Sequence, residues 1–188
     1  LKLKAGSWKG IEANAIWQID GKFRYIRSLL NKFDGKIVAA GGAVFRACAN
    51  GFKGDEDIDI FFLDQGFDSI HKYTEFLNEV VSFLISECLK RSTVMVVVTR
   101  NEHVTTVYAY GGIPETATYH DEKYQFIHRV YPNVGSILGG FDIGACMMAY
   151  TASGIFATEL GAWCFFNRAV IVDTTRRSTS YEHRLTKY

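Results

Sequence analysis

Residues 57–63 read Asp57-Ile58-Asp59-Ile60-Phe61-Phe62-Leu63, with two acids at the start of an otherwise apolar run. Its apolar residues predict a strand over 58–63 that is buried for most of its length. Side chains on a β-strand alternate between two faces, so Asp57 and Asp59 should face the same side, roughly 6.5–7 Å apart along the chain. An acid pair on one face of an apolar strand is therefore the first feature that needs a chemical explanation.

Two neighbouring carboxylates repel each other and resist burial. A hard divalent cation relieves both costs, because Mg²⁺ takes oxygen ligands and usually keeps waters and substrate phosphates. We therefore expect Asp57 and Asp59 to bind Mg²⁺ or Mn²⁺. In the alternative, residues 55–59 are a solvated acidic loop that runs into an edge strand. The position of Asp59 between Ile58 and Ile60 argues against that alternative.

A glycine pair precedes the acids. Residues 36–40 (KIVAA) predict a short strand that ends on Gly41-Gly42, and residues 43–49 suit a short helix. Glycines after a strand let backbone N–H groups approach a phosphate, and a helix N-terminus favours the anion. A glycine pair after a strand is often only a turn. Its order in the chain, followed by a helix and then the acid pair, points to phosphate binding.

The rest of the chain predicts a single domain, residues 1–188, of the α+β class. Helices separated by several strands indicate a mixed sheet flanked by helices. The expected helices cover 22–33, 69–90 and 134–138, and a last one begins near Thr179. The expected strands cover 94–99, 104–110, 124–130, 141–150, 155–157 and 169–172.

With a glycine pair after one strand, then a helix and then an acid-bearing strand, the sequence resembles the nucleotidyltransferase superfamily. This superfamily includes polymerase-beta-like enzymes, poly(A) polymerases and cyclic GMP-AMP synthase. The resemblance rests on Ala40-Gly41-Gly42 followed by Asp57-Ile58-Asp59-Ile60. It implies a mixed-sheet palm and acids that bind metal to position a nucleoside triphosphate. One metal ion would activate the attacking oxygen and the other would steady the leaving pyrophosphate.

The resemblance also requires a third carboxylate on a later strand. Asp142 is the candidate, because it enters the apolar stretch that begins at Phe141. It could instead cap the turn at Gly139-Gly140. Asp173 is a second candidate, although Asp-Thr-Thr after a strand is also typical of a helix cap or turn.

Basic residues near the end of the chain could contact phosphates. Arg176 and Arg177 are adjacent, and Arg184 follows within about two helical turns. Arginine binds phosphate oxygens bidentately, so these three are candidate substrate-binding residues. A solvated basic helix is the alternative. This segment also resembles a nucleotidyltransferase-like domain of some viral and ankyrin-repeat-bearing proteins.

Two departures from the family pattern favour a second hypothesis. Residues 43–56 make a long spacer between the glycines and Asp57. Many members have Gly-Ser in place of the glycine pair, whereas here no serine occupies the pair and Ala43 follows it, so a hydroxyl contact to the terminal phosphates is missing. The leading hypothesis is metal-dependent transfer of a nucleotidyl group from a nucleoside triphosphate to a hydroxyl, with an RNA end favoured as acceptor. The alternative is an inactive module of the same fold that binds RNA or a protein partner.

Composition limits the setting of the protein. The chain has 188 residues, 48% of them apolar, and a net charge of +1, so a strong global attraction to nucleic acid or membrane is not expected. The four cysteines have no paired spacing, which favours buried free thiols in a reducing, cytoplasmic compartment. The start at Leu1 suggests a domain excised from a longer chain with flanking domains.

Overall fold

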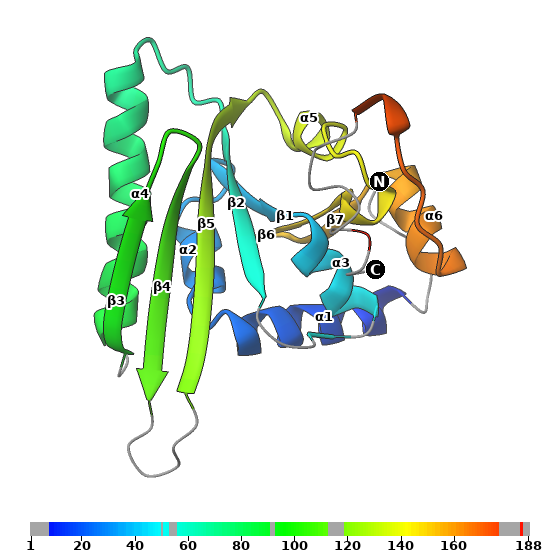
Figure 1. Cartoon of the computed structure of the whole chain (residues 1–188), viewed down its shortest axis with the longest axis horizontal. Helices are drawn as coiled ribbons and strands as arrows, with labels where there is room; N and C mark the ends of the chain where they lie inside the picture. Colours follow the sequence, from blue (N-terminus) through cyan, green and yellow to red (C-terminus); the bar gives the residue numbers. More distant parts are fainter. Residues whose placement is uncertain are drawn as a thin grey trace.

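The computed structural model describes residues 8–49, 51–52, 56–90, 93–112, 119–176 and 185, and its elements form one mixed α/β arrangement (Figure 1). The helices are α1 (Trp8–Lys22), α2 (Ile26–Lys32), α3 (Gly42–Ala49), α4 (Ile70–Lys90), α5 (Val134–Leu138) and α6 (Glu159–Asn167). The strands are β1 (Ile37–Ala40), β2 (Asp57–Leu63), β3 (Thr93–Arg100), β4 (Val104–Gly112), β5 (Tyr119–Tyr131), β6 (Met148–Thr151) and β7 (Gly154–Ala157). Two short 3₁₀ helices cover Gly144–Cys146 and Thr174–Arg176.

The sheet has seven strands in the order β3-β4-β5-β2-β1-β6-β7. The acid-bearing strand β2 lies in the middle, antiparallel to β1 and parallel to β5. The prediction of a largely buried strand is confirmed, since Ile58, Ile60 and Phe62 are fully buried. The alternative hypothesis, in which an acidic loop runs into an edge strand, is wrong about the strand, because β2 has a neighbouring strand on each side.

One face of the sheet carries the main hydrophobic core. Residues of α1 to α4 and α6 pack there against alternate residues of the strands, and α1 also contacts α3. Phe62 illustrates the packing, with its ring edge-on to Tyr73 and Phe76. Burying one such aromatic side chain contributes about 1.5–3 kcal/mol. Figure 1 shows α4 running along the β3–β4 end of this layer.

The opposite face of the sheet is only partly covered. Helix α5 packs there on a small cluster that includes Val38, Ala40 and Phe61. Since Asp57 and Asp59 share the parity of Phe61 on β2, they point to this second face. Both acids are only partly buried, so the fold leaves them within reach of solvent.

Several sequence expectations need correction. The helix expected over 22–33 begins only at Ile26, as α2, because Lys22 is the last residue of α1 and residues 23–25 form a turn between the two helices. The strand expected over 141–150 begins only at Met148. Before it lies a 3₁₀ helix so close to α6 that a Cβ on Gly144 would lie 2.8 Å from the Sγ of Cys164. The strand expected over 169–172 is reduced to one bridge, between Val172 and Ile143. The helix near Thr179 falls outside the described residues.

The four cysteines lie in the interior of the protein. All four cysteines are free and buried, as predicted. Burial raises the pKa of the Cys48 thiol to about 12, so this thiol is not poised for nucleophilic chemistry. None of the described helices combines the length and the apolarity that crossing a bilayer requires.

Candidate functional site

The two acids of β2 converge on one point above the sheet. The side-chain amide of Gln125, oriented with its nitrogen towards the acids, donates to Oδ2 of Asp57 at 2.7 Å and to Oδ1 of Asp59 at 3.1 Å. One nitrogen can reach both carboxylates only if they lie on the same face and close together. This geometry agrees with the two-residue period of the strand.

The glycine turn lies beside this acid pair. In the sheet register Ala40 pairs with Asp59, so the chain leaves β1 directly beside Asp59. Gly41 has φ +104, and a Cβ built on it would lie 3.6 Å from Oδ2 of Asp59 and 3.5 Å from the ring of Phe141. The positive φ explains why glycine occupies this position. The predicted proximity of the glycine pair and the acid pair is thus present.

Helix α3 begins directly at Gly42. The N–H of Gly41 donates to the carbonyl of Met148 at 2.9 Å, so this group is used by the sheet. The N–H groups of the first helical turn, residues 42–44, point along the helix axis towards its N-terminal end. This end carries the positive part of the helix dipole, so it favours anions, the Asp59 carboxylate included.

A lysine on the neighbouring strand compensates part of the acidic charge. Lys123 pairs with Asp57 in the parallel register of β2 and β5, and its Nζ lies 3.3 Å from Oδ2 of Asp57. Both side chains are about one third exposed, so solvent screens the pair and it contributes little stability. The site therefore combines two carboxylates, one ammonium group and one amide.

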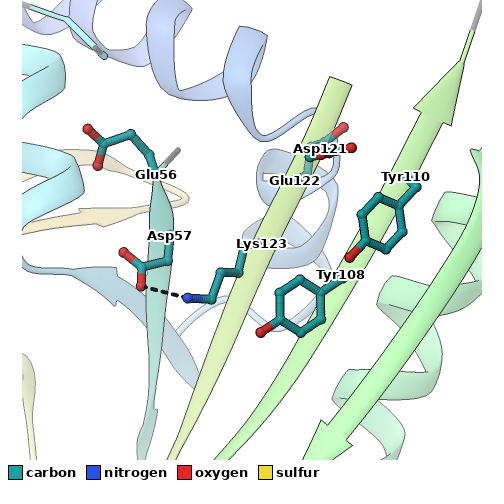
Figure 2. A pocket seen from close by; sticks show the side chains of 7 residues that line it. All are labelled: Glu56, Asp57, Tyr108, Tyr110, Asp121, Glu122 and Lys123. Atoms are coloured by element: carbon teal, nitrogen blue, oxygen red, sulfur yellow. Dashed lines mark hydrogen bonds and ion pairs between the residues drawn. The ribbon is translucent and has the colours of Figure 1, made fainter. Parts of the chain in front are cut away.

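A hollow of about 380 Å³ opens beside Asp57 and Lys123. Figure 2 shows Asp57 joined to Lys123 on one side and the rings of Tyr108 and Tyr110 on the other. Both tyrosines come from β4, where Tyr108 pairs with Lys123 and Tyr110 with Asp121. Glu56 also lines the hollow, and its carboxylate is paired with Arg46 of α3.

The last lining residue, Glu122, has a structural role. Its carboxylate is 1% exposed and accepts from the backbone N–H of Arg24 at 2.8 Å and from Nε of Arg24 at 2.5 Å. It also accepts from the hydroxyl of Tyr124. Burial raises the pKa of that hydroxyl well above its usual range, and the negative charge of Glu122 adds to the shift.

Asp142 does not join the acid pair. Within the described ranges, no three acid, histidine or cysteine side chains come close enough to hold one metal ion. Asp142 itself is buried, and its neighbour Phe141 lies against the glycine turn, on the β1 side of the acids. The strand beside the acids on the open side is β5, and it offers Lys123 and Gln125 instead.

The C-terminal candidates are placed only in part. Arg177 and Arg184 lie outside the described residues, as does the side chain of Arg176, the last residue of the second 3₁₀ helix. Asp173 behaves as the turn residue foreseen as one alternative. Its Oδ1 accepts from the N–H of Thr175 at 3.0 Å and from the Thr175 hydroxyl at 2.6 Å.

Lys123 and Gln125 were missed in the sequence. Their signal is a polar residue at every second position in Lys123-Tyr124-Gln125-Phe126, the same period as in the acid pair. The expected strand began only at Tyr124. The parallel pairing of β5 with β2 was also needed to place both residues beside Asp57 and Asp59.

The arrangement of the sheet and its flanking helices is shared with a solved structure. The CCA-adding enzyme in its apo form I superimposes with a TM-score of 0.53 at 14% identity, over 88% of this chain and 36% of that one. This similarity shows the shared fold, a mixed sheet with flanking helices. Polymerase beta of Leishmania infantum matches at a TM-score of 0.37 and 17% identity, over 82% of this chain and 55% of that one.

Sequence comparison gives the family. Residues 14–163, more than half of the chain, match the Gabija anti-defense 2 family, and the chain belongs to it. An uncharacterized protein of Acanthamoeba polyphaga mimivirus is 31% identical over 185 residues, which cover 93% of this chain and 39% of that protein. The chain thus spans about two fifths of the length of this viral relative.

Proposed function

We propose that this chain carries out metal-dependent transfer of a nucleotidyl group from a nucleoside triphosphate to a hydroxyl acceptor. The observation that carries the proposal is the convergence of Asp57 and Asp59 on one point, with the Asp59 carboxylate beside Gly41 at the start of α3. A cation-binding acid pair and an anion-favouring helix end therefore lie side by side. A metal–triphosphate complex needs both.

The donor set suits Mg²⁺ or Mn²⁺. Both ions prefer oxygen ligands, and Mg²⁺ is typically held by one or two carboxylates together with substrate phosphates. Asp57 and Asp59 supply two such carboxylates, and the resemblance to the superfamily supports the same residues. A bound divalent ion would neutralise the phosphate charge and stabilise the charge that develops during transfer.

Other residues of the site would bind the phosphates and position the two carboxylates. The first turn of α3 would receive the terminal phosphates, because its N–H groups point towards Gly41 and the acids. Gln125 fixes the orientation of both carboxylates through its amide. Lys123 holds Asp57 on the side away from the glycine turn. This division leaves the hollow beside Tyr108 for the second substrate.

A second candidate is a non-catalytic module that keeps the fold to bind a partner. The specific observation in its favour is the pair Lys123 and Gln125, which compensates the two acids without a metal ion. A family named for anti-defence admits either role, enzymatic or inhibitory. We propose the enzymatic role because acids that only formed structural contacts with Lys123 and Gln125 would not need a glycine turn and a helix N-terminus beside them.

The proposal is tested by adding Mn²⁺ and each labelled nucleoside triphosphate to the protein. The melting temperature reports binding, and the transfer of the labelled nucleotidyl group to an acceptor reports activity. Ligands that bind the native state raise its melting temperature by several degrees at saturation. We expect a metal-dependent rise that is lost in Asp57→Asn and Asp59→Asn and kept in the matched control Asp68→Asn on the exposed start of α4. A wild-type protein that binds no metal–triphosphate complex would support the non-catalytic module.

A further inference from the structure

The hollow beside the acid pair has an aromatic wall that none of the roles above uses. The rings of Tyr108 and Tyr110 are nearly parallel, with an interplanar angle of 9° and centroids 6.3 Å apart. They project from alternate positions of β4 on the second face of the sheet. Figure 2 shows both rings opposite the Asp57–Lys123 pair.

The aromatic wall continues into the edge strand. Val97 and Met95 of β3 pair directly with Tyr108 and Tyr110, so all four side chains share one face. Met95 is 50% exposed and Val97 36% exposed. The tyrosines thus lie next to a solvent-accessible apolar strip, and both are only partly buried.

The charges around the hollow restrict what can occupy it. Among the described residues that line it, Lys123 is the single cation; it is paired with Asp57 and also lies 6.0 Å from the centre of the Tyr108 ring. Asp57 and Asp121 are acidic and accessible, and Glu56 is held by Arg46. A row of phosphates would be repelled here, whereas a flat uncharged ring would not.

The position of the hollow gives it a role. Gly41 and the start of α3 lie on the β1 side of the acids, and the tyrosines lie on the β5–β4 side. If the triphosphate binds over the glycine turn, the acceptor must reach Asp57 and Asp59 from the opposite side. That side is the hollow.

We propose that Tyr108 and Tyr110 bind the nucleobase of the acceptor by stacking, so that the acceptor is a nucleoside, a nucleotide or the end of a nucleic acid strand. This assignment rests on the proposed nucleotidyl transfer for its role as acceptor site. The binding of a base does not itself require transfer. Every base presents a π-face to an aromatic side chain, and a pocket of a few hundred Å³ is the size that small ligands occupy.

The test measures the quenching of 2-aminopurine riboside, a fluorescent nucleoside without phosphate, in the absence of metal. We expect binding by the wild type, a loss of about tenfold to a hundredfold in affinity in Tyr108→Ala, and near-wild-type affinity in Tyr108→Phe, which keeps the ring. Trp17→Ala removes an aromatic side chain that is 75% exposed on α1 and should change nothing. Equal binding by the wild type and Tyr108→Ala would overturn the assignment.

A further measurement distinguishes a nucleobase at the end of a strand from the base of a free nucleoside or nucleotide. A short single-stranded RNA ending in 2-aminopurine and the free nucleoside 5′-monophosphate are compared with the riboside. Tighter binding of the RNA identifies a strand end, and equal or weaker binding identifies a free nucleoside or nucleotide.

In parallel, Mn²⁺–triphosphate binding is followed by melting temperature. Normal triphosphate stabilisation with no riboside binding overturns the acceptor site alone. Riboside binding without triphosphate stabilisation overturns nucleotidyl transfer alone.

Discussion

The ammonium group of Lys123 lies 3.3 Å from Oδ2 of Asp57, across the parallel pairing of β5 and β2. The contact places a fixed positive charge at a carboxylate that we propose as a metal ligand. Lys123 and a divalent cation therefore compete for the same oxygen. The pair is about one third exposed on each side, so the competition is worth no more than about 1 kcal/mol.

Replacing the lysine should strengthen metal binding. We expect Lys123→Met to bind Mn²⁺ up to about fivefold more tightly than the wild type, the factor that corresponds to about 1 kcal/mol. Isothermal titration calorimetry measures the change. Lys72→Met is the matched control, because Lys72 forms a similar pair with Asp68 on the surface of α4, at 2.6 Å. Weaker Mn²⁺ binding in Lys123→Met would show that the lysine supports the acid geometry instead of competing with metal.

Neutralising one acid should leave the fold intact. Asp57 and Asp59 both contact one amide nitrogen of Gln125, so without metal they repel each other at short range. We expect Asp59→Asn to unfold in urea with a free energy equal to or above that of the wild type, while metal-dependent transfer is lost. A decrease of more than about 1 kcal/mol would identify Asp59 as a structural hydrogen-bond partner.

The buried Glu122 should behave in the opposite way. Its removal leaves the Arg24 guanidinium and the buried Tyr124 hydroxyl without their acceptor. Breaking a buried pair costs 3–5 kcal/mol, and the partial exposure of Arg24 places Glu122→Ala at the lower end, about 3 kcal/mol. Urea unfolding measures the loss, with Glu102→Ala as a control on an 83% exposed side chain. A loss comparable to the control would show that the Arg24–Glu122 pair is dispensable.

The sequence was most informative where the interactions are local. The common face of Asp57 and Asp59 follows from the two-residue strand period alone. The glycine turn was expected beside them from the chain order of strand, glycine pair, helix and acid-bearing strand, and the antiparallel pairing of Ala40 with Asp59 places it there. Long-range pairing carries no comparable signal. The parallel partner of β2 is more than sixty residues away, at Lys123, so the sequence offered Asp142 for a position where the fold places Lys123 and Gln125.

Helix α1 was missed for a related reason. Gly10 and Gly21 disfavour a helix, and only Trp8, Ala15 and Ile19 of its residues are buried, a spacing too sparse to mark one apolar stripe. Tertiary contacts stabilise this helix, including those of α1 with α3 and with β7. The strand expected over 141–150 failed because α6 packs against Gly144, a contact that the local pattern does not encode.

Tyr73 gives the protein a sensitivity to alkaline pH. Burial raises the pKa of its hydroxyl from the ordinary 10.0 to about 12. Between these values the unfolded chain loses the tyrosine proton and the folded chain keeps it, so stability falls as pH rises from about 10 to about 12. In Tyr73→Phe we expect a smaller decrease in the free energy of unfolding over this range. Urea unfolding at pH 9, 10 and 11 measures it.

The same variant should not lose stability at neutral pH. The Tyr73 hydroxyl is buried and has no hydrogen-bond partner among the described residues, so its removal costs no bond there. Leaving such a group unsatisfied costs about 1–3 kcal/mol, and we expect Tyr73→Phe to be equally or more stable at pH 7. An identical pH dependence in the two proteins would mean that Tyr73 does not titrate in this range.

The glycine turn offers the sharpest separation of stability from function, because Gly41 and Gly35 both have positive φ, at +104 and +70. Replacing either by alanine introduces backbone strain of about 1–2 kcal/mol or more. A Cβ on Gly35 would meet open space, whereas a Cβ on Gly41 would lie against Phe141 and the Asp59 carboxylate. We therefore expect both variants to melt at lower temperature than the wild type. Only Gly41→Ala should lose stabilisation by Mn²⁺ and triphosphate, by roughly tenfold or more in affinity, since it crowds the space where the phosphates approach. Equal losses of binding in both variants would indicate a general effect of strain, and full binding by Gly41→Ala would show that the phosphates do not bind at this turn.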